Sequence, residues 1–346
     1  MYEKPFHTED PGNYSFLITG GAGFIGSNLA EYLIKYKARK VRVLDNLSTG
    51  FLHNIQPFFS NPAFEFIEGD IRNLENCRTA VTGIDFVLHQ AALGSVPRSI
   101  ADPITTHEVN ISGFLNMLVA VKESSVKRMV YAASSSTYGN SKELPKVEER
   151  IGDPLSPYAV TKYVNELYAN VFARTYNLKL IGLRYFNVFG PRQDPNGAYA
   201  AVIPKFVDRL LNHQSPVING DGEYSRDFTF VENVVQANIL ALFAKKPDAI
   251  NTVYNVAYGE QTSLNQLVQA LKKYLSVQDA SIAGINAKHG PNREGDIPHS
   301  LASIEKAKKY LDYSPEFNFS DGLRIAVEWY RNNSPATPSG KLTRGL

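Results

Sequence analysis

Short apolar segments alternate with longer amphipathic ones through the first half of the chain. Apolar runs of about five residues predict strands, and the helically spaced stretches between them predict helices. We expect strands at 14–19, 40–45, 64–68, 85–89, 128–134 and 179–186, and helices at 23–36, 74–81, 103–124 and 157–176. Because strands that alternate with helices form parallel βαβ units, the pattern predicts an α/β fold with a doubly wound parallel sheet.

The pattern changes after about residue 187, where a segment rich in Pro, Gly, Asn and Asp precedes short mixed elements. These predict a smaller, mixed α/β substrate domain. Two stretches are expected to return to the sheet layer: a strand leading into a helix at 227–243, and a short strand at 252–257. The expected division is a first domain over 1–186 with returns at about 227–257, a second domain over 187–226 and 258–332, and a disordered tail over 333–346.

The composition limits the classes of protein and partner. At 346 residues the chain is long enough for a core without disulfides, and its single cysteine, Cys77, cannot pair within the chain. The 36 Lys and Arg residues nearly balance the 34 Asp and Glu residues, and the net charge of +2 argues against nucleic acid and membranes as partners. No apolar run has the length of a membrane span. We therefore expect a soluble cytoplasmic protein without a metal.

Three glycines follow the first predicted strand at Gly20, Gly23 and Gly26. Glycines permit a tight turn, and the start of the next helix presents N–H groups and partial positive charge to a pyrophosphate. Asp45 closes the second predicted strand, where a carboxylate accepts hydrogen bonds from an adenosine ribose. Since a carboxylate there repels a 2′-phosphate, the pattern predicts NAD rather than NADP. The alternative for Asp45 is a turn residue at the end of a strand.

Of three Tyr-x-x-x-Lys pairs in the chain, only Tyr158–Lys162 falls within a predicted helix, where this spacing puts both side chains on one face. Ser156 is a suitable N-cap, and Pro157 fits the first helical position. An ammonium near a phenol stabilises the phenolate, so we expect Lys162 to lower the pKa of Tyr158 and make it a base near neutral pH. The alternative is a tyrosine that packs on the sheet beside a solvated lysine.

These features together resemble the extended short-chain dehydrogenase/reductase family, and within it the nucleotide-sugar 4-epimerases, over about residues 15–330. Serines at the end of the fifth predicted strand belong to the same resemblance. Longer motifs are similar to bacterial UDP-N-acetylglucosamine 4-epimerases. The further motifs that carry the resemblance are Asp70-Ile71, His89-Gln90-Ala91-Ala92, Gly94-Ser95-Val96-Pro97-Arg98-Ser99, Arg184-Tyr185-Phe186-Asn187, Arg192-Gln193-Asp194-Pro195 and Arg293-Glu294-Gly295-Asp296.

The resemblance implies a Rossmann-type domain, NAD that stays bound through turnover, a UDP-sugar substrate and a homodimer built on a four-helix interface. It implies cofactor contacts at Gly20, Gly23, Phe24, Ile25, Gly26, Asp45, Asn46, Asp70, Ile71, Gln90, Ala91, Ala92, Asn110, Ala133, Tyr158, Lys162 and Tyr185. It implies substrate contacts at Ser95, Ser134, Ser135, Ser136, Tyr158, Asn187, Ala201, Val202, Val217, Asn219, Arg226, Arg293, Asp296 and Ser300.

The resemblance also implies a reaction in which Ser134, Tyr158 and Lys162 are catalytic, although Ser135 and Ser136 leave the register of the serine open. In the family, the tyrosine removes the proton of the sugar 4-hydroxyl while C4 gives up a hydride, and the 4-keto sugar turns over before the hydride returns. Ser300 stands where the family varies between a bulky tyrosine and a small residue. A small residue leaves room for a 2-acetamido group, which predicts interconversion of UDP-GlcNAc and UDP-GalNAc, with UDP-Glc and UDP-Gal slower.

Three alternative functions stay open. A 4-epimerase of a UDP-N-acetylhexosaminuronic acid needs only one extra donor for the C6 carboxylate. A UDP-sugar dehydratase or decarboxylase shares the cofactor turn but usually has acidic residues where Ser135 and Ser136 stand. A non-catalytic dinucleotide-sensing module usually lacks the tyrosine or the lysine, and both are present here. Arg226 and Arg293 can clamp a diphosphate, or each can pair with a neighbouring acid.

Overall fold

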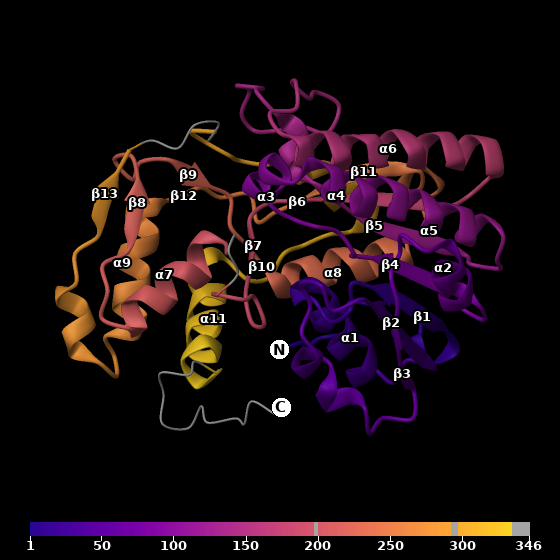
Figure 1. Cartoon of the computed structure of the whole chain (residues 1–346), viewed down its shortest axis with the longest axis horizontal. Helices are drawn as coiled ribbons and strands as arrows, with labels where there is room; N and C mark the ends of the chain where they lie inside the picture. Colours follow the sequence, from indigo (N-terminus) through magenta and orange to yellow (C-terminus); the bar gives the residue numbers. More distant parts are fainter. Residues whose placement is uncertain (197–199, 292–296, 334–346) are drawn as a thin grey trace.

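Seven parallel strands form the central sheet of the computed structural model, which describes residues 1–196, 200–291 and 297–333. Their order across the sheet is β11-β6-β5-β4-β1-β2-β3 (Figure 1). The strands are β1 (Ser15–Thr19), β2 (Lys40–Asp45), β3 (Phe64–Glu68), β4 (Phe86–His89), β5 (Arg128–Ser134), β6 (Leu180–Tyr185) and β11 (Thr252–Val256). The predicted α/β fold with a doubly wound sheet is confirmed, and each of the first six strands matches its predicted bounds to within one residue at either end.

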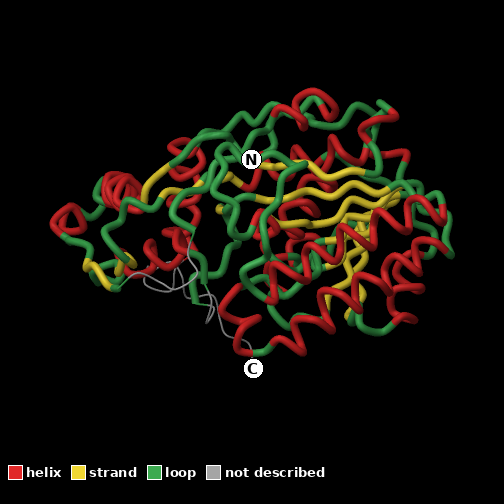
Figure 2. Tube along the Cα trace, turned by 90° about the horizontal axis from the view of Figure 1, so that it is seen from above, coloured by secondary structure: helices red, strands yellow, loops and turns green. Residues whose placement is uncertain are grey.

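Helices cover both faces of this sheet (Figures 1 and 2). One face carries α1 (Phe24–Lys35), α8 (Val231–Leu242) and α10 (Glu305–Leu311). The other carries α2 (Leu74–Val81), α5 (Gly113–Lys122) and α6 (Pro157–Tyr176), with the short helices α3 (Val96–Ala101) and α4 (Pro103–His107) packed on α6. Fully buried side chains such as Leu29 and Val235 fill the first interface, and Phe114 and Met117 fill the second. Burial of this apolar surface holds the layers together.

The single helix predicted over 103–124 is interrupted in the structure. A π-helical turn over Glu108–Ser112 separates α4 from α5. The wider turn directs Asn110 into the interior, where its amide nitrogen donates to the carbonyl of Leu93 and to the hydroxyl of Thr161. Such turns occur within otherwise regular helices and leave no signature in hydrophobic periodicity, which explains why the pattern predicted one helix.

The remaining elements form a second group, which we call the C-terminal lobe (left in Figure 1). It contains α7 (Val202–Leu211), α9 (Leu264–Leu275) and α11 (Phe319–Asn333), whose facing side chains form a separate apolar core. Its paired strands are β8 (Val217–Asn219) with β13 (Lys288–Gly290), β9 (Ser225–Arg226) with β12 (Thr262–Ser263), and β7 (Val188–Phe189) with β10 (Thr229–Phe230). Across both groups of elements, the described residues also form short 3₁₀ helices: η1 (Pro11–Asn13), η2 (Leu52–Asn54), η3 (Gln56–Phe58), η5 (Ser135–Tyr138), η6 (Pro247–Ala249) and η7 (Ala280–Gly284).

One of the two expected returns differs from its prediction. In the stretch 227–243, only the helix α8 packs on the central sheet, because β10 pairs with β7 outside it. The stretch 252–257 supplies β11, which pairs with β6. Of the predicted disordered tail, Asn333 is the last residue of α11, and 334–346 lie outside the described residues.

The length and hydropathy of the helices bear on whether any of them could span a membrane. Over 1–196, 200–291 and 297–333, none of them combines the length and the apolar character needed to cross a bilayer.

Candidate active site

The glycine turn lies between β1 and α1, at the carboxyl edge of the sheet. Gly20 has φ +69°, and a Cβ added there would lie 2.7 Å from the backbone of Ala91. A Cβ added to Gly26 would lie 2.2 Å from the carbonyl oxygen of Gly20. Helix α1 begins after Gly23 with no side-chain cap. The turn therefore needs glycine for its geometry and leaves helix N–H groups available to an anionic group.

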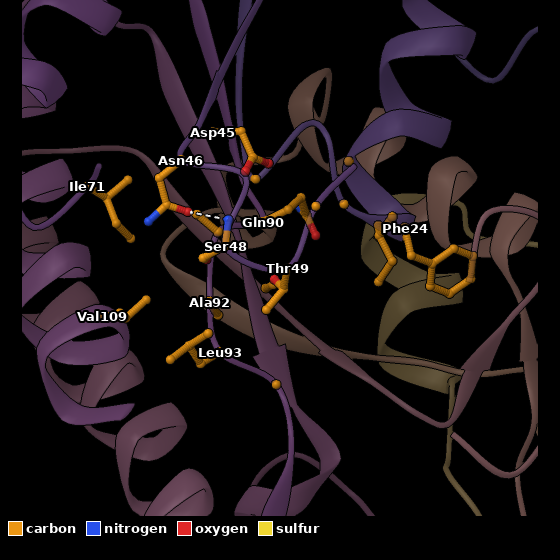
Figure 3. A pocket seen from close by; sticks show the side chains of 18 of the residues that line it. Phe24, Asp45, Asn46, Ser48, Thr49, Ile71, Gln90, Ala92, Leu93 and Val109 are labelled. Carbon is orange, nitrogen blue, oxygen red and sulfur yellow. Dashed lines mark hydrogen bonds between the residues drawn. The ribbon is translucent and has the colours of Figure 1, made fainter. Parts of the chain in front are cut away.

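Asp45 closes this turn from the end of β2. Its carboxylate accepts hydrogen bonds from the backbone N–H groups of Ala22 at 2.9 Å and Leu47 at 2.8 Å. Burial raises the pKa of the Asp45 carboxyl, although these two hydrogen bonds oppose the shift. Each oxygen keeps a further lone pair for a hydroxyl donor such as a ribose. Beside it, the Asn46 side chain accepts a hydrogen bond from the N–H of Ser48 (dashed in Figure 3).

Asp70 follows β3, and its side chain is already engaged within the protein. Arg72 and Asn46 donate to it at 2.7 Å and 2.8 Å, and the hydrogen bond from Arg72 is the main cause that lowers the pKa of Asp70 to about 2. Next to it, Ile71 lines the cavity together with Val109 and Leu93, opposite Phe24 (Figure 3). This apolar wall suits a flat base such as adenine.

The predicted Ser-Tyr-Lys constellation comes from two elements. Ser134 ends β5, and its Oγ accepts hydrogen bonds from the N–H of Ser136 at 3.1 Å and its hydroxyl at 2.9 Å. Tyr158 lies in the first turn of α6, where the side chain of Ser156 caps the helix. Of the three serines at the end of this strand, Ser134 is the one that lines the cavity, together with Tyr158.

Lys162 lies one helical turn after Tyr158 and is 3% exposed. Its Nζ donates to the carbonyl of Ala132 at 2.8 Å and stands 6.0 Å from the centre of the Tyr158 ring. Burial lowers the pKa of Lys162 to about 8. Burial also raises the pKa of Tyr158, with Ser134 acting in the opposite direction. The expectation that Lys162 lowers the tyrosine pKa is therefore wrong for the protein by itself, because desolvation of the phenolate outweighs other effects.

Tyr185 and Gln90 meet at the floor of the cavity. The Tyr185 hydroxyl donates to Oε1 of Gln90 at 3.1 Å, and Asn238 of α8 donates to the same hydroxyl at 2.9 Å. Asn238 belongs to no motif in the sequence, so it was not among the predicted site residues. Asn110 does not line the cavity but holds the Leu93 loop from behind its wall.

A single cavity of about 440 Å³ connects these groups along the carboxyl edge of the sheet. Of the predicted cofactor residues, all but Asn110 and Lys162 line it. Several other lining residues were not among the predicted site residues, although some of them lie next to the motifs in sequence: Ser48, Thr49, Gly50, Leu93, Val109, Arg192 and Asp194. The cavity combines a helix N-terminus, a carboxylate and an apolar slot, so it fits a dinucleotide.

The predicted substrate residues are more dispersed. Asn187 lines the cavity, and Ser95 caps α3 close to it through Gly94. Most others belong to the C-terminal lobe and do not line the cavity: Ala201, Val202, Val217, Asn219, Arg226 and Ser300. Arg293 and Asp296 lie outside the described residues.

Comparisons with known proteins agree with this geometry. The model of the NAD dependent epimerase/dehydratase family matches residues 16–257, and the chain belongs to this family. This confirms the predicted family and the NAD cofactor.

Three solved structures are similar over nearly the whole chain. A UDP-N-acetylglucosamine 4-epimerase from Methanobrevibacter ruminantium, in complex with UDP-N-acetylmuramic acid, is 38% identical with a TM-score of 0.85; 92% of this chain and 99% of that chain are covered. A UDP-glucose 4-epimerase from Thermotoga maritima, with UDP-glucose, is 36% identical with a TM-score of 0.84 over the same shares. A UDP-glucuronic acid 4-epimerase from Bacillus cereus, with UDP-glucuronic acid and NAD, is 31% identical with a TM-score of 0.82, again over 92% and 99%.

Proposed function

We propose that this chain is an NAD-dependent UDP-sugar 4-epimerase that interconverts UDP-GlcNAc and UDP-GalNAc, and UDP-Glc and UDP-Gal more slowly. The similarity to three UDP-sugar 4-epimerases supports the reaction class. The choice of an N-acetylated sugar depends on the small side chain of Ser300. Its N–H donates to the carbonyl of Ser225 at 3.1 Å, so its small side chain stands next to the Arg226 strand. A small residue there leaves space for the 2-acetamido group.

In the proposed complex, NAD extends along the cavity from the glycine turn. The glycine turn and the start of α1 hold the pyrophosphate of NAD, Asp45 holds the adenosine ribose, and Ile71 with Val109 flanks the adenine. The nicotinamide end faces Ser134, Tyr158 and Tyr185, which share the cavity wall. NAD held there would supply an oxidised nicotinamide able to accept a hydride and give it back, and its positive charge would favour a nearby phenolate.

In this proposal, side chains of the protein transfer the proton and position the 4-hydroxyl oxygen. Tyr158 takes the proton of the 4-hydroxyl and gives it back after the 4-keto sugar has turned over. Ser134 positions the same oxygen, since its hydroxyl hydrogen is not used on Ser136. Lys162 is buried one helical turn after Tyr158 and completes the nicotinamide side of the site.

The UDP half binds in the C-terminal lobe. Asn187, Val217, Asn219 and Arg226 contact it, with Ala201, Val202, Arg293 and Asp296 completing the set. The substrate domain then comprises 187–226 and 258–332, and the NAD-binding domain comprises 1–186 with the returns at about 227–257. Placement of β11 in the central sheet supports this division.

A homodimer is part of the proposal. Val160, Leu167 and Val171 follow one face of α6 at helical spacing and are 45 to 49% exposed. Ile100 and Ile104 on the adjoining α3 and α4 are also exposed, at 64% and 72%. Burying this surface against the same face of a second copy pairs two helices from each chain in a four-helix interface.

The test is turnover without added cofactor. Purified protein is incubated with UDP-GlcNAc, and the products are resolved by anion-exchange chromatography and NMR. We expect UDP-GalNAc to form, and we expect none with Tyr158→Phe carrying a normal content of NAD. No conversion by the wild type even with NAD supplied would refute the proposal.

The substrate choice needs a second comparison. Ser300→Tyr is expected to suppress turnover of the acetamido pair while UDP-Glc turnover continues, and Ser300→Ala is expected to keep both. A pocket change of this size shifts specificity by about 10- to 200-fold. Equal losses on both pairs would remove Ser300 from the specificity argument. Faster turnover of UDP-N-acetylglucosaminuronic acid would favour the uronic alternative, which the similarity to a UDP-glucuronic acid 4-epimerase supports.

A further inference from the structure

Asp227 is a fully buried carboxylate that the reaction described above does not use. It lies between β9 and β10, directly after Arg226. In the described part of the chain, its hydrogen-bond partners are backbone N–H groups rather than cations. Tyr258 and Gly259 donate to Oδ1 at 3.2 Å, and Gly259 and Ala302 donate to Oδ2 at 3.2 Å.

These donors belong to two segments that are distant in sequence from Asp227. One is the loop that leaves β11, which begins with Ala257. The other is the extended segment 298–303, which we call the Ser300 ribbon. One side chain therefore joins the β9–β10 connection, the β11 loop and the Ser300 ribbon.

The Ser300 ribbon is held on both sides by backbone hydrogen bonds. On one side, Ser225 donates to the carbonyl of Pro298 at 3.0 Å, and Ser300 donates to that of Ser225 at 3.1 Å. On the other, Lys146 donates to the carbonyl of Leu301 at 2.7 Å, and Ser303 donates to that of Lys146 at 2.9 Å. The N–H of Ala302 is not used in either set and points to Asp227.

Two proposed substrate residues are tied to the same point. The side chain of Asn187 donates to the backbone carbonyl of Asp227 at 3.3 Å. The guanidinium of Arg226 donates to the carbonyls of Ser225 and Pro298, at 2.9 Å and 3.2 Å. The positions of Asn187, Arg226 and Ser300 thus depend on the segments that Asp227 joins.

We propose, on the basis of the proposed function, that Asp227 is a positioning residue for the UDP-sugar, whose carboxylate keeps Arg226, Asn187 and Ser300 in register around the substrate. A carboxylate suits this task because two oxygens can accept several N–H groups at once. Burial raises the pKa of Asp227 to about 6, while the backbone hydrogen bonds act in the opposite direction. The group is therefore ionised at neutral pH, where it accepts all of these bonds.

The experiment uses the NAD-loaded enzyme and distinguishes an effect on substrate binding from an effect on the stability of the fold. Asp227→Asn keeps the size but turns an NH₂ group toward backbone donors. We expect KM for UDP-GlcNAc and Kd for UDP, measured by isothermal titration calorimetry, to rise roughly tenfold or more, with kcat within about threefold and the NAD content unchanged. A merely structural role predicts a lower Tm with unchanged KM and Kd.

Two further variants sharpen the comparison. Glu148→Gln is the matched control, because Glu148 is another buried carboxylate that accepts a backbone N–H, from Asn255 at 2.8 Å. It is expected to keep the wild-type KM. Ala302→Pro removes one N–H donor without touching the carboxylate, and it should raise Kd for UDP in the same direction even if Asp227→Asn does not fold.

Three results would overturn the inference: unchanged Kd for UDP in both Asp227→Asn and Ala302→Pro, an equal rise in Glu148→Gln, or no UDP binding by the wild type. The proposed function is judged separately. A wild type that binds UDP but epimerises no UDP-sugar would refute the function, while the ratio of UDP affinities between variant and wild type would still decide the role of Asp227.

Discussion

The burial of Lys162 predicts a measurable dependence of the free energy of unfolding on pH. Lys162 is 3% exposed, and its ammonium donates a hydrogen bond to the carbonyl of Ala132. Burial lowers the pKa of Lys162 from 10.5 to about 8. Each pKa unit corresponds to about 1.4 kcal/mol, so keeping this lysine protonated in the folded protein costs about 3 kcal/mol of stability.

The sign of the effect follows from proton binding. Below pH 8 the lysine is protonated in both the folded and the unfolded state, and the full cost is present. Between about pH 8 and 10.5 the folded lysine loses its proton first, so the unfolded state binds more protons and the free energy of unfolding rises with pH. Above this window the cost is gone.

Lys162→Met removes the buried charge and keeps the length of the side chain. In NAD-free protein, we expect the variant to be more stable than the wild type at pH 7 and to lose about 3 kcal/mol of this advantage by pH 10.5. Urea denaturation at both pH values measures it. The exposed Lys205→Met variant controls for removal of a lysine in general. A difference between wild type and Lys162→Met that is the same at pH 7 and pH 10.5 would refute the reasoning.

Two further predictions concern the cofactor turn and the proposed dimer. Gly26→Ala places a Cβ 2.2 Å from the carbonyl oxygen of Gly20, so we expect the purified variant to lose most of its NAD. Chromatography after denaturation measures the NAD content. Gly284→Ala is the control and is expected to keep its NAD, because a Cβ there meets no atom within 4 Å. Leu167→Glu is expected to convert a dimer into a monomer in size-exclusion chromatography with light scattering; Val277→Glu, at a site 79% exposed, is the control, and a dimer that survives Leu167→Glu would contradict the proposed interface.

The sequence predicted those parts of the site that depend on neighbours along the chain. The glycine turn is one, because a Cβ on Gly23 or Gly26 would meet backbone atoms of Gly20 in the same β-α connection. The Tyr158–Lys162 pair is another, because a four-residue spacing and the cap at Ser156 define one helix face. Both patterns are local, so they could be read without knowing which strands are neighbours.

Other features arise where distant segments meet. Val109 and Leu93 form the apolar wall with Ile71, although each lies on a different element. Asp227 had no signal at all, because backbone N–H donors carry no sequence identity. The sequence also left open which of Ser134, Ser135 and Ser136 is the catalytic serine, because this depends on the direction in which the end of β5 points each hydroxyl.

The sequence by itself determined the α/β fold, the family and the NAD cofactor, because these rest on hydrophobic periodicity and on short motifs whose geometry is local. Only the tertiary structure decided which serine lines the cavity, that β10 leaves the central sheet, and that burial, rather than a neighbouring charge, dominates the pKa values of Tyr158 and Lys162. Desolvation depends on every atom packed around a group, and that packing comes from residues far apart in the chain.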